Sequence, residues 1–247
     1  MACAYGKDVV GVDGAEGVCQ FNQRKDRLIS CNDKTWCKFH LPENADVSLD
    51  DLASALDRSF NNYLFENIRE AHARRAVADM SGVVFRKSFA LSQVSKELGA
   101  LPALIFNGCI FVGDTNFSQC NFANGVQFNK CTFKNTANFS GAKFCGYAEF
   151  SGSNFVERAI FSDVVFDGKG MFGSVKFHAV CNFSNSTFRD AVNFNKVEFC
   201  EDACFRGMTT FLNARTTFRE ASFCRKAEFS HAKFGGYISF RVRTHNQ

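Results

Sequence analysis

Residues 106–155 read FNGCIFVGDTNFSQCNFANGVQFNKCTFKNTANFSGAKFCGYAEFSGSNF. Phenylalanine returns in this stretch after five and then six residues, and the alternation continues without a miss as far as Phe205. The rhythm expands by two residues across Phe211 and Phe218, and it resumes at Phe223, Phe229, Phe234 and Phe240. Twenty-five of the 31 phenylalanines lie on this lattice. One short unit, repeated many times, therefore determines the fold of this part of the chain.

The position two residues before nearly every lattice phenylalanine is small or β-branched, as at Cys109, Thr115 and Ala137. Residues two apart on an extended segment point to the same side, so each unit sends one small and one bulky side chain inward before the chain turns. This period excludes an α-helix and predicts a squared β-solenoid. A phenylalanine-rich β-sandwich is the alternative, but its strands and loops would vary in length. Steps of 5, 6, 5 and 6 residues make a 22-residue coil.

That coil length predicts one vertical column of rings and about six coils between residues 106 and 240. The column consists of Phe106, Phe128, Phe150, Phe172 and Phe194. Serine or asparagine often follows the phenylalanine that ends a six-residue step, which suits corners capped by hydrogen bonds from side chain to backbone.

The repeat resembles the pentapeptide-repeat family, whose units read A-(D/N)-(L/F)-x-x, as in Ala137-Asn138-Phe139-Ser140-Gly141. The resemblance covers roughly residues 81–240 and departs from the simplest pattern in its phenylalanine centres and six-residue units. It implies a mainly β fold, a right-handed quadrilateral β-helix of about 20 residues per coil.

Three regions are expected along the chain: a Cys/His module over residues 1–47, a helical cap with a first coil and a helical insertion over 48–105, and the repeat array over 106–247. Ser48 is a helix N-cap, and apolar residues three or four apart predict an amphipathic helix over about 48–76. We expect its apolar face to cover the open first coil; the alternative is a partner-binding helix. Val83 and Phe85 match the small and large positions of a first coil, and residues 91–101 predict a short helix.

The N-terminal module contains Cys37 and His40 in a Cys-x2-His arrangement, which is a zinc half-site because both side chains can reach one tetrahedral ion. The module also resembles the small domains that precede many bacterial pentapeptide arrays. On that resemblance Cys3, Cys19, Cys37 and His40 are the expected ligands of a structural zinc ion, with Cys31 as the spare. Free thiols in a small cap are the alternative, and a catalytic zinc is disfavoured because four protein ligands leave no open position.

The composition, 46% hydrophobic and 22% charged over 247 residues, is that of a globular protein. No signal peptide opens the sequence and no run of about 18 apolar residues occurs, so a cytoplasmic protein is expected. Its twelve cysteines are then expected as reduced thiols or metal ligands. Cys109, Cys120 and Cys131 occupy small inward positions, whereas Cys145, Cys200 and Cys224 follow lattice phenylalanines and should be more exposed.

Charge is concentrated at the C-terminal end, where residues 206–247 carry eight basic and two acidic side chains, a net charge of +6. These candidate partner-binding residues are Arg206, Arg215, Arg219, Arg225, Lys226, Lys233, Arg241 and Arg243. They could meet an acidic partner or nucleic-acid phosphates. The alternative is a solvated end that keeps an open β edge soluble.

The sequence contains no phosphate-binding loop, dinucleotide fingerprint, zinc-protease motif or nucleophile elbow, so we do not expect an enzyme. We expect a non-catalytic scaffold that binds a protein partner of unknown identity. One alternative, implied by the family resemblance, is an acidic DNA mimic that engages a type II topoisomerase (gyrase), but this array is near neutral and then basic. The other is a nucleic-acid binder that uses the basic C-terminal coils. The open last coil favours a homodimer formed end to end.

Overall fold

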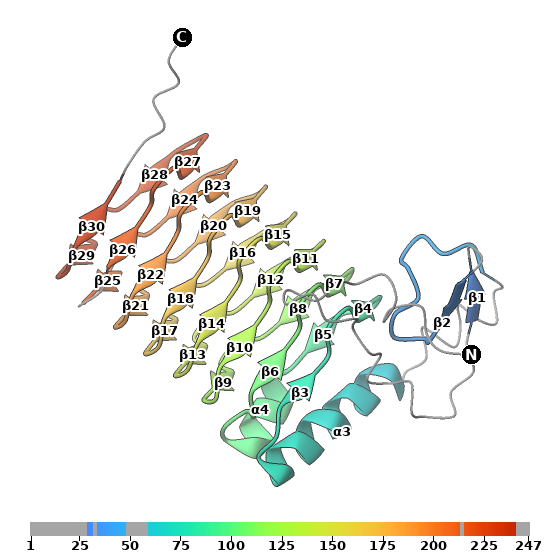
Figure 1. Cartoon of the computed structure of the whole chain (residues 1–247). Coiled ribbons are helices and arrows are strands. Elements are labelled where there is room, and N and C mark those ends of the chain that lie inside the picture. Colours follow the sequence, from blue (N-terminus) through green and yellow to red (C-terminus); the bar gives the residue numbers. More distant parts are fainter. Residues whose placement is uncertain (1–28, 32–33, 48–58, 213–214, 241–247) are drawn as a thin grey trace.

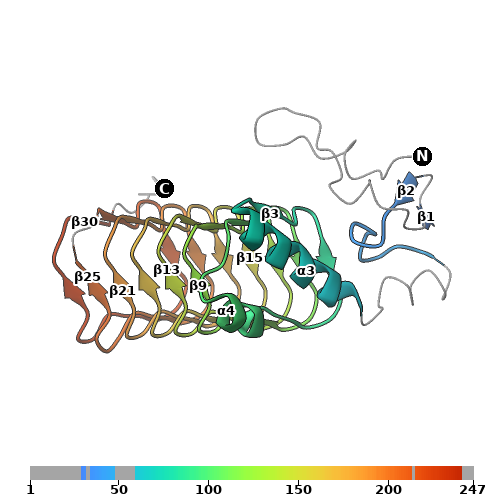
Figure 2. The same cartoon turned by 90° about the horizontal axis from the view of Figure 1, so that it is seen from below.

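The computed structural model describes residues 29–31, 34–47, 59–212 and 215–240. Its main body is a β-solenoid whose short strands stack in four parallel sheets (Figure 1). The sheets form the four sides of a rod, which Figure 2 shows along its length. A separate antiparallel pair, β1 (Ile29–Cys31) and β2 (Lys34–Trp36), lies in the N-terminal region. The predicted mainly β solenoid is thus confirmed.

We number the four faces in the order in which the chain meets them. Face 1 contains β3 (Ala78–Asp79), β6 (Leu104–Ile105), β10 (Val126–Gln127), β14 (Ala148–Glu149), β18 (Gly170–Met171), β22 (Val192–Asn193), β26 (Thr216–Thr217) and β30 (Ile238–Ser239). Face 2 contains β4 (Val84–Phe85), β7 (Ile110–Phe111), β11 (Thr132–Phe133), β15 (Asn154–Phe155), β19 (Lys176–Phe177), β23 (Glu198–Phe199) and β27 (Ser222–Phe223).

The other two sides are built in the same way. Face 3 contains β5 (Phe89–Ala90), β8 (Thr115–Asn116), β12 (Ala137–Asn138), β16 (Ala159–Ile160), β20 (Cys181–Asn182), β24 (Ala203–Cys204) and β28 (Ala227–Glu228). Face 4 contains β9 (Asn121–Phe122), β13 (Lys143–Phe144), β17 (Val165–Phe166), β21 (Thr187–Phe188), β25 (Thr210–Phe211) and β29 (Lys233–Phe234).

The strand register confirms the 22-residue coil. Phe133 pairs with Phe155, and Phe155 pairs with Phe177, at a constant separation. The separation grows to 24 residues between Val192 and Thr216, where the two-residue expansion of the repeat is accommodated. It is 26 residues between Ala78 and Leu104, because the helical insertion lies in that first coil.

The core consists of stacked phenylalanine rings. Rings at the same position of successive coils lie nearly parallel, and in the column on face 1 their centroids are 4.8–5.2 Å apart. This column runs through Phe106, Phe128, Phe150, Phe172, Phe194, Phe218 and Phe240, as the repeat predicts. Between columns the rings meet edge to face, as Phe139 and Phe150 do. Both arrangements are favourable for aromatic pairs.

The two step lengths correspond to two kinds of corner. The corners between faces 1 and 2 and between faces 3 and 4 are tight, and their second residue has a positive φ, as at Lys130 (55°), Asn185 (60°) and Gly152 (68°). Glycine, asparagine and short polar residues tolerate this conformation best. Asparagine side chains cap these corners: the Ser118 N–H donates to Asn116 Oδ1 at 2.9 Å. A cap by the residue that follows the phenylalanine, as predicted, occurs between faces 1 and 2, where Asn129 Oδ1 accepts from the Ser151 N–H at 3.1 Å. Between faces 3 and 4, the cap is instead the asparagine that precedes the phenylalanine, as Asn116 is.

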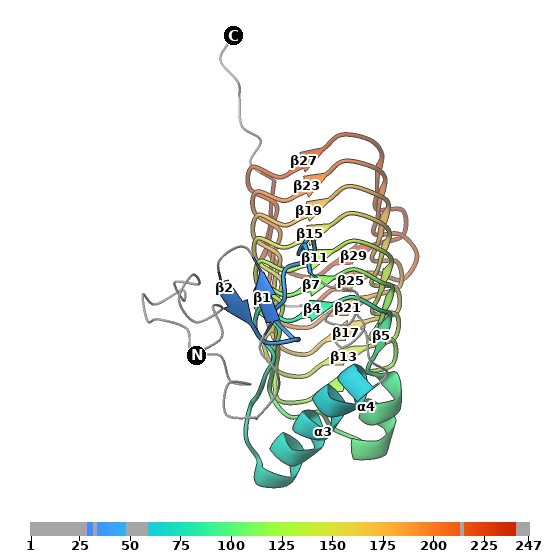
Figure 3. The same cartoon turned by 90° about the vertical axis from the view of Figure 1, so that its right-hand side faces the viewer.

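Two helices close the N-terminal end of the solenoid (Figure 3). Helix α3 (Ser59–Arg74) buries Phe60, Leu64 and Ile68, and the Phe60 ring packs edge-on against Phe85 of the first coil. The predicted helix over 48–76 is thus confirmed where it is described, and residues 48–58 lie outside the described residues. Helix α4 (Ser92–Leu98) is the predicted insertion.

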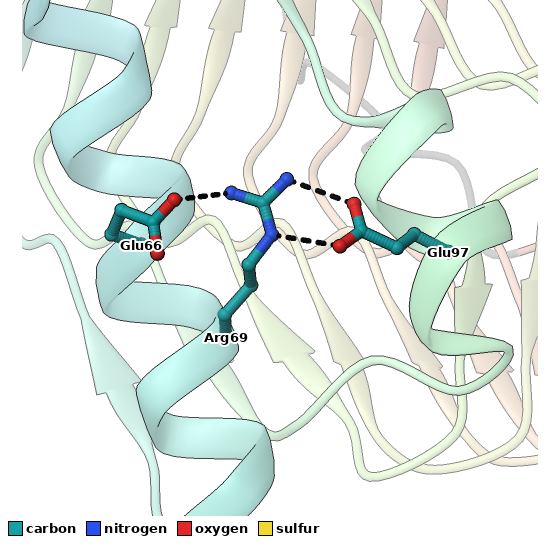
Figure 4. Close-up of polar contacts among 3 residues, drawn as sticks. All are labelled: Glu66, Arg69 and Glu97. Carbon is teal, nitrogen blue, oxygen red and sulfur yellow. Dashed lines mark hydrogen bonds and ion pairs between the residues drawn. The ribbon is translucent and has the colours of Figure 1, made fainter.

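Arg69 joins the two helices on the surface of this cap (Figure 4). Its Nε and Nη2 donate to the two carboxylate oxygens of Glu97 at 3.0 and 2.8 Å, and its Nη1 donates to Glu66 at 2.8 Å. The pairing raises the pKa of Arg69, since Glu97 and Glu66 both stabilise the charged guanidinium. The bidentate geometry orients α4 against α3.

The C-terminal end has no such cover among the described residues. Phe234 and Phe240 are 42% and 51% exposed, whereas the lattice phenylalanines of the middle coils are completely buried. Tyr237 beside them is also exposed. Neither described helix is long and apolar enough to cross a membrane.

Candidate functional surfaces

The Cys37–His40 turn lies against the first coil, and both side chains are buried. The backbone N–H of His40 donates to the backbone carbonyl of Cys37 at 3.0 Å, which closes a tight turn. His40 Nε2 is 3.0 Å from the carbonyl oxygen of Ser81, so we assign the ring proton to Nε2. The Nδ1 lone pair then faces Cys37 Sγ at 3.2 Å.

This arrangement fits two ligands of a tetrahedral zinc ion. Zn–S and Zn–N bonds of about 2.3 and 2.0 Å place the two donor atoms about 3.5 Å apart, close to the observed separation. A histidine that donates its second ring N–H to a backbone carbonyl is oriented as a metal ligand requires. Cys31 lies in β1, and Cys3 and Cys19 lie outside the described residues. Among the residues that are described, no three His, Cys, Asp or Glu side chains converge on one point.

Arg86, from the first coil, holds the segment that follows this turn. Its Nη2 donates to the carbonyls of Leu41 and Pro42 at 2.7 and 2.6 Å, and its Nη1 donates to the Glu43 carbonyl at 3.2 Å. Burial lowers the pKa of Arg86, and the Glu43 charge partly offsets this effect. Lys134, further along face 2, pairs with the Glu43 carboxylate at 2.6 Å. The 37–43 segment is thus attached to the first coils of the solenoid.

The predicted basic residues are distributed around the rod. Arg206 lies at the corner between faces 3 and 4, Arg215 immediately before face 1, Arg219 after face 1, Arg225 and Lys226 between faces 2 and 3, and Lys233 on face 4. Arg241 and Arg243 lie outside the described residues. The described ones therefore form a ring around the last two coils instead of a stripe along one face.

Several of these basic side chains are paired with acids of neighbouring positions. Arg225 pairs with Glu201 at 3.0 Å, and Glu228 receives Lys226 at 3.1 Å and Arg206 at 3.6 Å. All three basic partners are well exposed. Such surface pairs contribute little to stability, so their main effect is to reduce the positive charge presented at the corners they occupy.

The end coil exposes backbone groups in an ordered way. At the lattice phenylalanines of faces 1 and 3, the N–H group points to the next coil, as in the bonds from Phe194 to Thr217 and from Phe205 to Glu228. At those of faces 2 and 4, the carbonyl points to the next coil, as that of Phe199 does to Cys224. In the last coil the N–H groups of Phe229 and Phe240 and the carbonyls of Phe223 and Phe234 have no described partner.

The thiols divide as the repeat predicts. Cys109, Cys120 and Cys131 are buried, and burial raises the pKa of Cys120 to about 12 and that of Cys109 well above its usual range. Cys145 and Cys200 are half-buried, and Cys224 is exposed. Buried protonated thiols of this kind fill space and are inert.

A shallow cleft of about 590 Å³ lies beside the end of α3. Residues of α3, of the segment after it and of the turns around Pro102 and Asn124 line it, including His72, Arg75 and Val77. Its two ionisable side chains are those of His72 and Arg75, and no carboxylate or thiol lines it. The cleft therefore lacks an acid–base or nucleophilic pair.

Sequence reasoning did not single out Arg86 or the Arg69–Glu97 pair. Each contact joins residues 28 to 45 positions apart through the first coil and its helices, where the repeat is interrupted. Only the lattice position of Arg86, directly after Phe85, indicates that its side chain leaves face 2. Nothing in the sequence indicates what it contacts.

The comparisons with known proteins identify the repeat. A family model described as pentapeptide repeats (9 copies) matches residues 103–143 and 128–169. These residues lie within coils whose stacked phenylalanines and tight corners are described above. No curated protein and no solved structure matches the chain.

Proposed function

Since the chain belongs to the pentapeptide-repeat family, we propose that it is a non-catalytic cytoplasmic scaffold that binds a protein partner through its C-terminal coil. The observation that carries this proposal is the open last coil, where Phe234 and Phe240 are about half exposed above a column of completely buried rings. An uncovered β edge with exposed aromatic rings is a site that proteins normally cover or pair.

A second copy of the chain is the occupant that this end fits. A two-fold axis that runs through opposite corners of the square exchanges faces 1 and 3 with faces 2 and 4. It therefore brings the N–H groups of Phe229 and Phe240 of one copy toward the carbonyls of Phe223 and Phe234 of the other. It also places the exposed rings of both ends together. The +6 charge of residues 206–247 opposes this pairing, and Glu201, which lies outside this range and pairs with Arg225, reduces the opposition.

Static light scattering at micromolar concentration tests the homodimer. We expect about twice the chain mass of 27.6 kDa for the native protein. We expect the chain mass itself for Phe240→Lys, which adds charge at the apolar end. Tyr147→Lys is the control, because Tyr147 is an exposed aromatic residue far from the end and its substitution should leave the dimer intact.

A native protein of 27.6 kDa would overturn the homodimer and leave an acidic protein as the partner that the basic ring fits. The scaffold itself is tested by affinity capture from the native host with the wild type, Phe240→Lys and Tyr147→Lys. A protein retained by the wild type and by Tyr147→Lys, but lost with Phe240→Lys, supports docking at the end. Equal retention by all three would contradict it.

The two alternative functions receive less support from the arrangement of charge. Residues 106–205 carry eight basic and nine acidic side chains, so the array lacks the excess of acid that a mimic of duplex DNA needs. The basic residues of the last coils surround the rod, whereas a nucleic-acid backbone tracks one continuous basic surface.

We also propose that Cys37 and His40 supply two ligands of a structural zinc ion, with Cys3 and Cys19 as the remaining ligands and Cys31 as the spare. The support is the Sγ to Nδ1 separation of 3.2 Å and the ring orientation that the Ser81 carbonyl imposes. Bound zinc would hold the N-terminal module together and against the first coil, since a short segment has little core of its own.

Elemental analysis of protein purified without chelator should give one zinc ion per chain. We expect His40→Ala to lose the metal, because it removes a ligand, and Cys31→Ser to keep it. Cys145→Ser is the control for a thiol outside the module. Protein without zinc, or His40→Ala with full zinc content, would contradict the proposal.

A further inference from the structure

Cys200 and Cys224 lie at equivalent positions of neighbouring coils on face 2. Each follows a lattice phenylalanine, and Phe199 and Phe223 pair directly in the sheet with their rings 4.8 Å apart. The Cys224 N–H donates to the Phe199 carbonyl at 2.8 Å, and the Cys200 N–H donates to the Phe177 carbonyl at 2.9 Å. Strands β23 and β27, which end just before these cysteines, lie side by side at the C-terminal end of the rod (Figure 1).

Neighbouring strands lie about 4.8 Å apart, and disulfides form between Cα atoms separated by about 4.4 to 6.8 Å. One ion pair beside the thiols joins their two coils: Arg225 pairs with Glu201 at 3.0 Å. A second, between Lys176 and Glu198 at 2.8 Å, joins the coil of Cys200 to the coil below it. The strand spacing therefore places the two Cα atoms at a separation that a disulfide can span, on a surface that solvent reaches.

The other described cysteines lack one of these two properties. Cys109 and Cys131 also stack on neighbouring coils of face 2, but both are buried, and their thiols donate to the carbonyls of Met80 and Phe106. Cys145 is half-buried like Cys200, but the equivalent positions above and below it are Asp167 and Ala123. Stacking and exposure coincide only at Cys200 and Cys224 among the described residues.

We propose that Cys200 and Cys224 are a redox-sensitive dithiol that closes to a disulfide with an oxidised low-molecular-weight thiol such as glutathione disulfide. The exposed Cys224 thiolate attacks one sulfur of glutathione disulfide, which forms a mixed disulfide and releases one glutathione thiolate. The Cys200 thiolate then attacks the Cys224 sulfur and releases the second. The two cysteines lose two electrons and two protons, and glutathione disulfide gains them as two molecules of glutathione.

The disulfide would join the last coil, whose phenylalanines are the least buried of the array, to the coil below it. In the last coil Phe223 and Phe229 are only half-buried, and Phe234 and Phe240 are exposed, so this coil opens more easily than those below it. The Cys200–Cys224 link closes a loop that contains the end of one coil and the start of the next. Oxidation therefore stabilises the surface that the proposed partner contacts, and reduction releases it.

The rate of closure should rise with pH. Burial raises the pKa of the Cys200 thiol. The Lys176 ammonium opposes this increase, and the nearby Cys224 thiol and the Glu198 carboxylate raise the pKa further. Since the thiolate is the attacking form, the resolving step accelerates about tenfold per pH unit below that pKa.

Mass spectrometry after incubation of the native chain with glutathione disulfide tests the proposal. We expect a species two mass units lighter, with a peptide that links Cys200 to Cys224, and little glutathione adduct at Cys224. Cys200→Ser should instead accumulate the adduct at Cys224, because no thiol remains to resolve it. Cys145 should acquire only a glutathione adduct, and Cys109 and Cys131 should stay unmodified.

Amide hydrogen exchange supplies a second readout. After oxidation, exchange over residues 221–240 should slow about tenfold or more, and a reducing agent or Cys224→Ser should restore the faster rate. A stable Cys224 adduct in the native chain, without the linked peptide, would overturn the dithiol. A linked peptide without slower exchange would overturn its role in fastening the last coil.

Discussion

Replacing Phe150 by alanine will lower the free energy of unfolding by about 3 to 5 kcal/mol, the cost of a large cavity in a packed core. Phe150 is completely buried in the middle of the rod. Its ring stacks on Phe128 at 5.2 Å and on Phe172 at 4.8 Å, and it meets Phe139 and Phe161 edge to face at 5.5 Å. Urea denaturation followed by circular dichroism measures the change.

Phe240→Ala is the matched control for this experiment. Phe240 belongs to the same column, but it stacks on one neighbour only, Phe218 at 4.8 Å, and is 51% exposed. Its removal leaves no closed cavity, so we expect a loss of about 1 kcal/mol. Equal losses for the two variants, or a loss below about 1 kcal/mol for Phe150→Ala, would contradict the role of the ring columns in stability.

Replacing Gly168 by alanine will lower the free energy of unfolding by about 1 to 3 kcal/mol. The cause is an added methyl group that has no space, whereas Phe150→Ala leaves a cavity. A Cβ atom at Gly168 would lie 2.4 Å from the carbonyl oxygen of Gly146 and 3.0 Å from that of Cys145. These atoms belong to the backbone of the coil below, so the clash is relieved only if the two coils move apart. Valine should cost more than alanine, because it adds volume at the same place.

Gly173→Ala is the control for Gly168→Ala. Its nearest neighbour would be Asn193 Nδ2 at 3.7 Å, an ordinary contact. We therefore expect a change within about 1 kcal/mol, in the stabilising direction, because alanine restricts the unfolded chain. The same denaturation series measures both variants. A Gly168→Ala protein as stable as Gly173→Ala would show that the corner between faces 4 and 1 is not tightly packed.

The sequence predicts one feature of the N-terminal end of the solenoid and not another. The amphipathic pattern of α3 predicts that this helix covers a coil, and Phe60 packs against Phe85 as that pattern requires. The attachment of the 37–43 segment by Arg86 is not predictable, since hydrogen bonds to carbonyls carry no signature in the acceptor residues.

The candidate sites show the same division. Cys37 and His40 are recognisable from their spacing, but the Ser81 carbonyl that orients the ring comes from the first coil. The proposed dithiol is located by the strand register. With a constant 22-residue period, Ser222 would lie above Cys200. The expansion of the repeat beyond Phe205 places Cys224 there instead.

The sequence by itself determined the coil, its inward columns and the absence of an ordinary globular core, because alternation along a strand and corners every five or six residues are local properties. Only the tertiary structure decided which outward side chains meet between coils, as Arg225 and Glu201 do, and how Arg86 attaches the 37–43 segment to the first coil. These depend on stacking between residues more than 20 positions apart, and a local period does not encode how an insertion shifts that stacking.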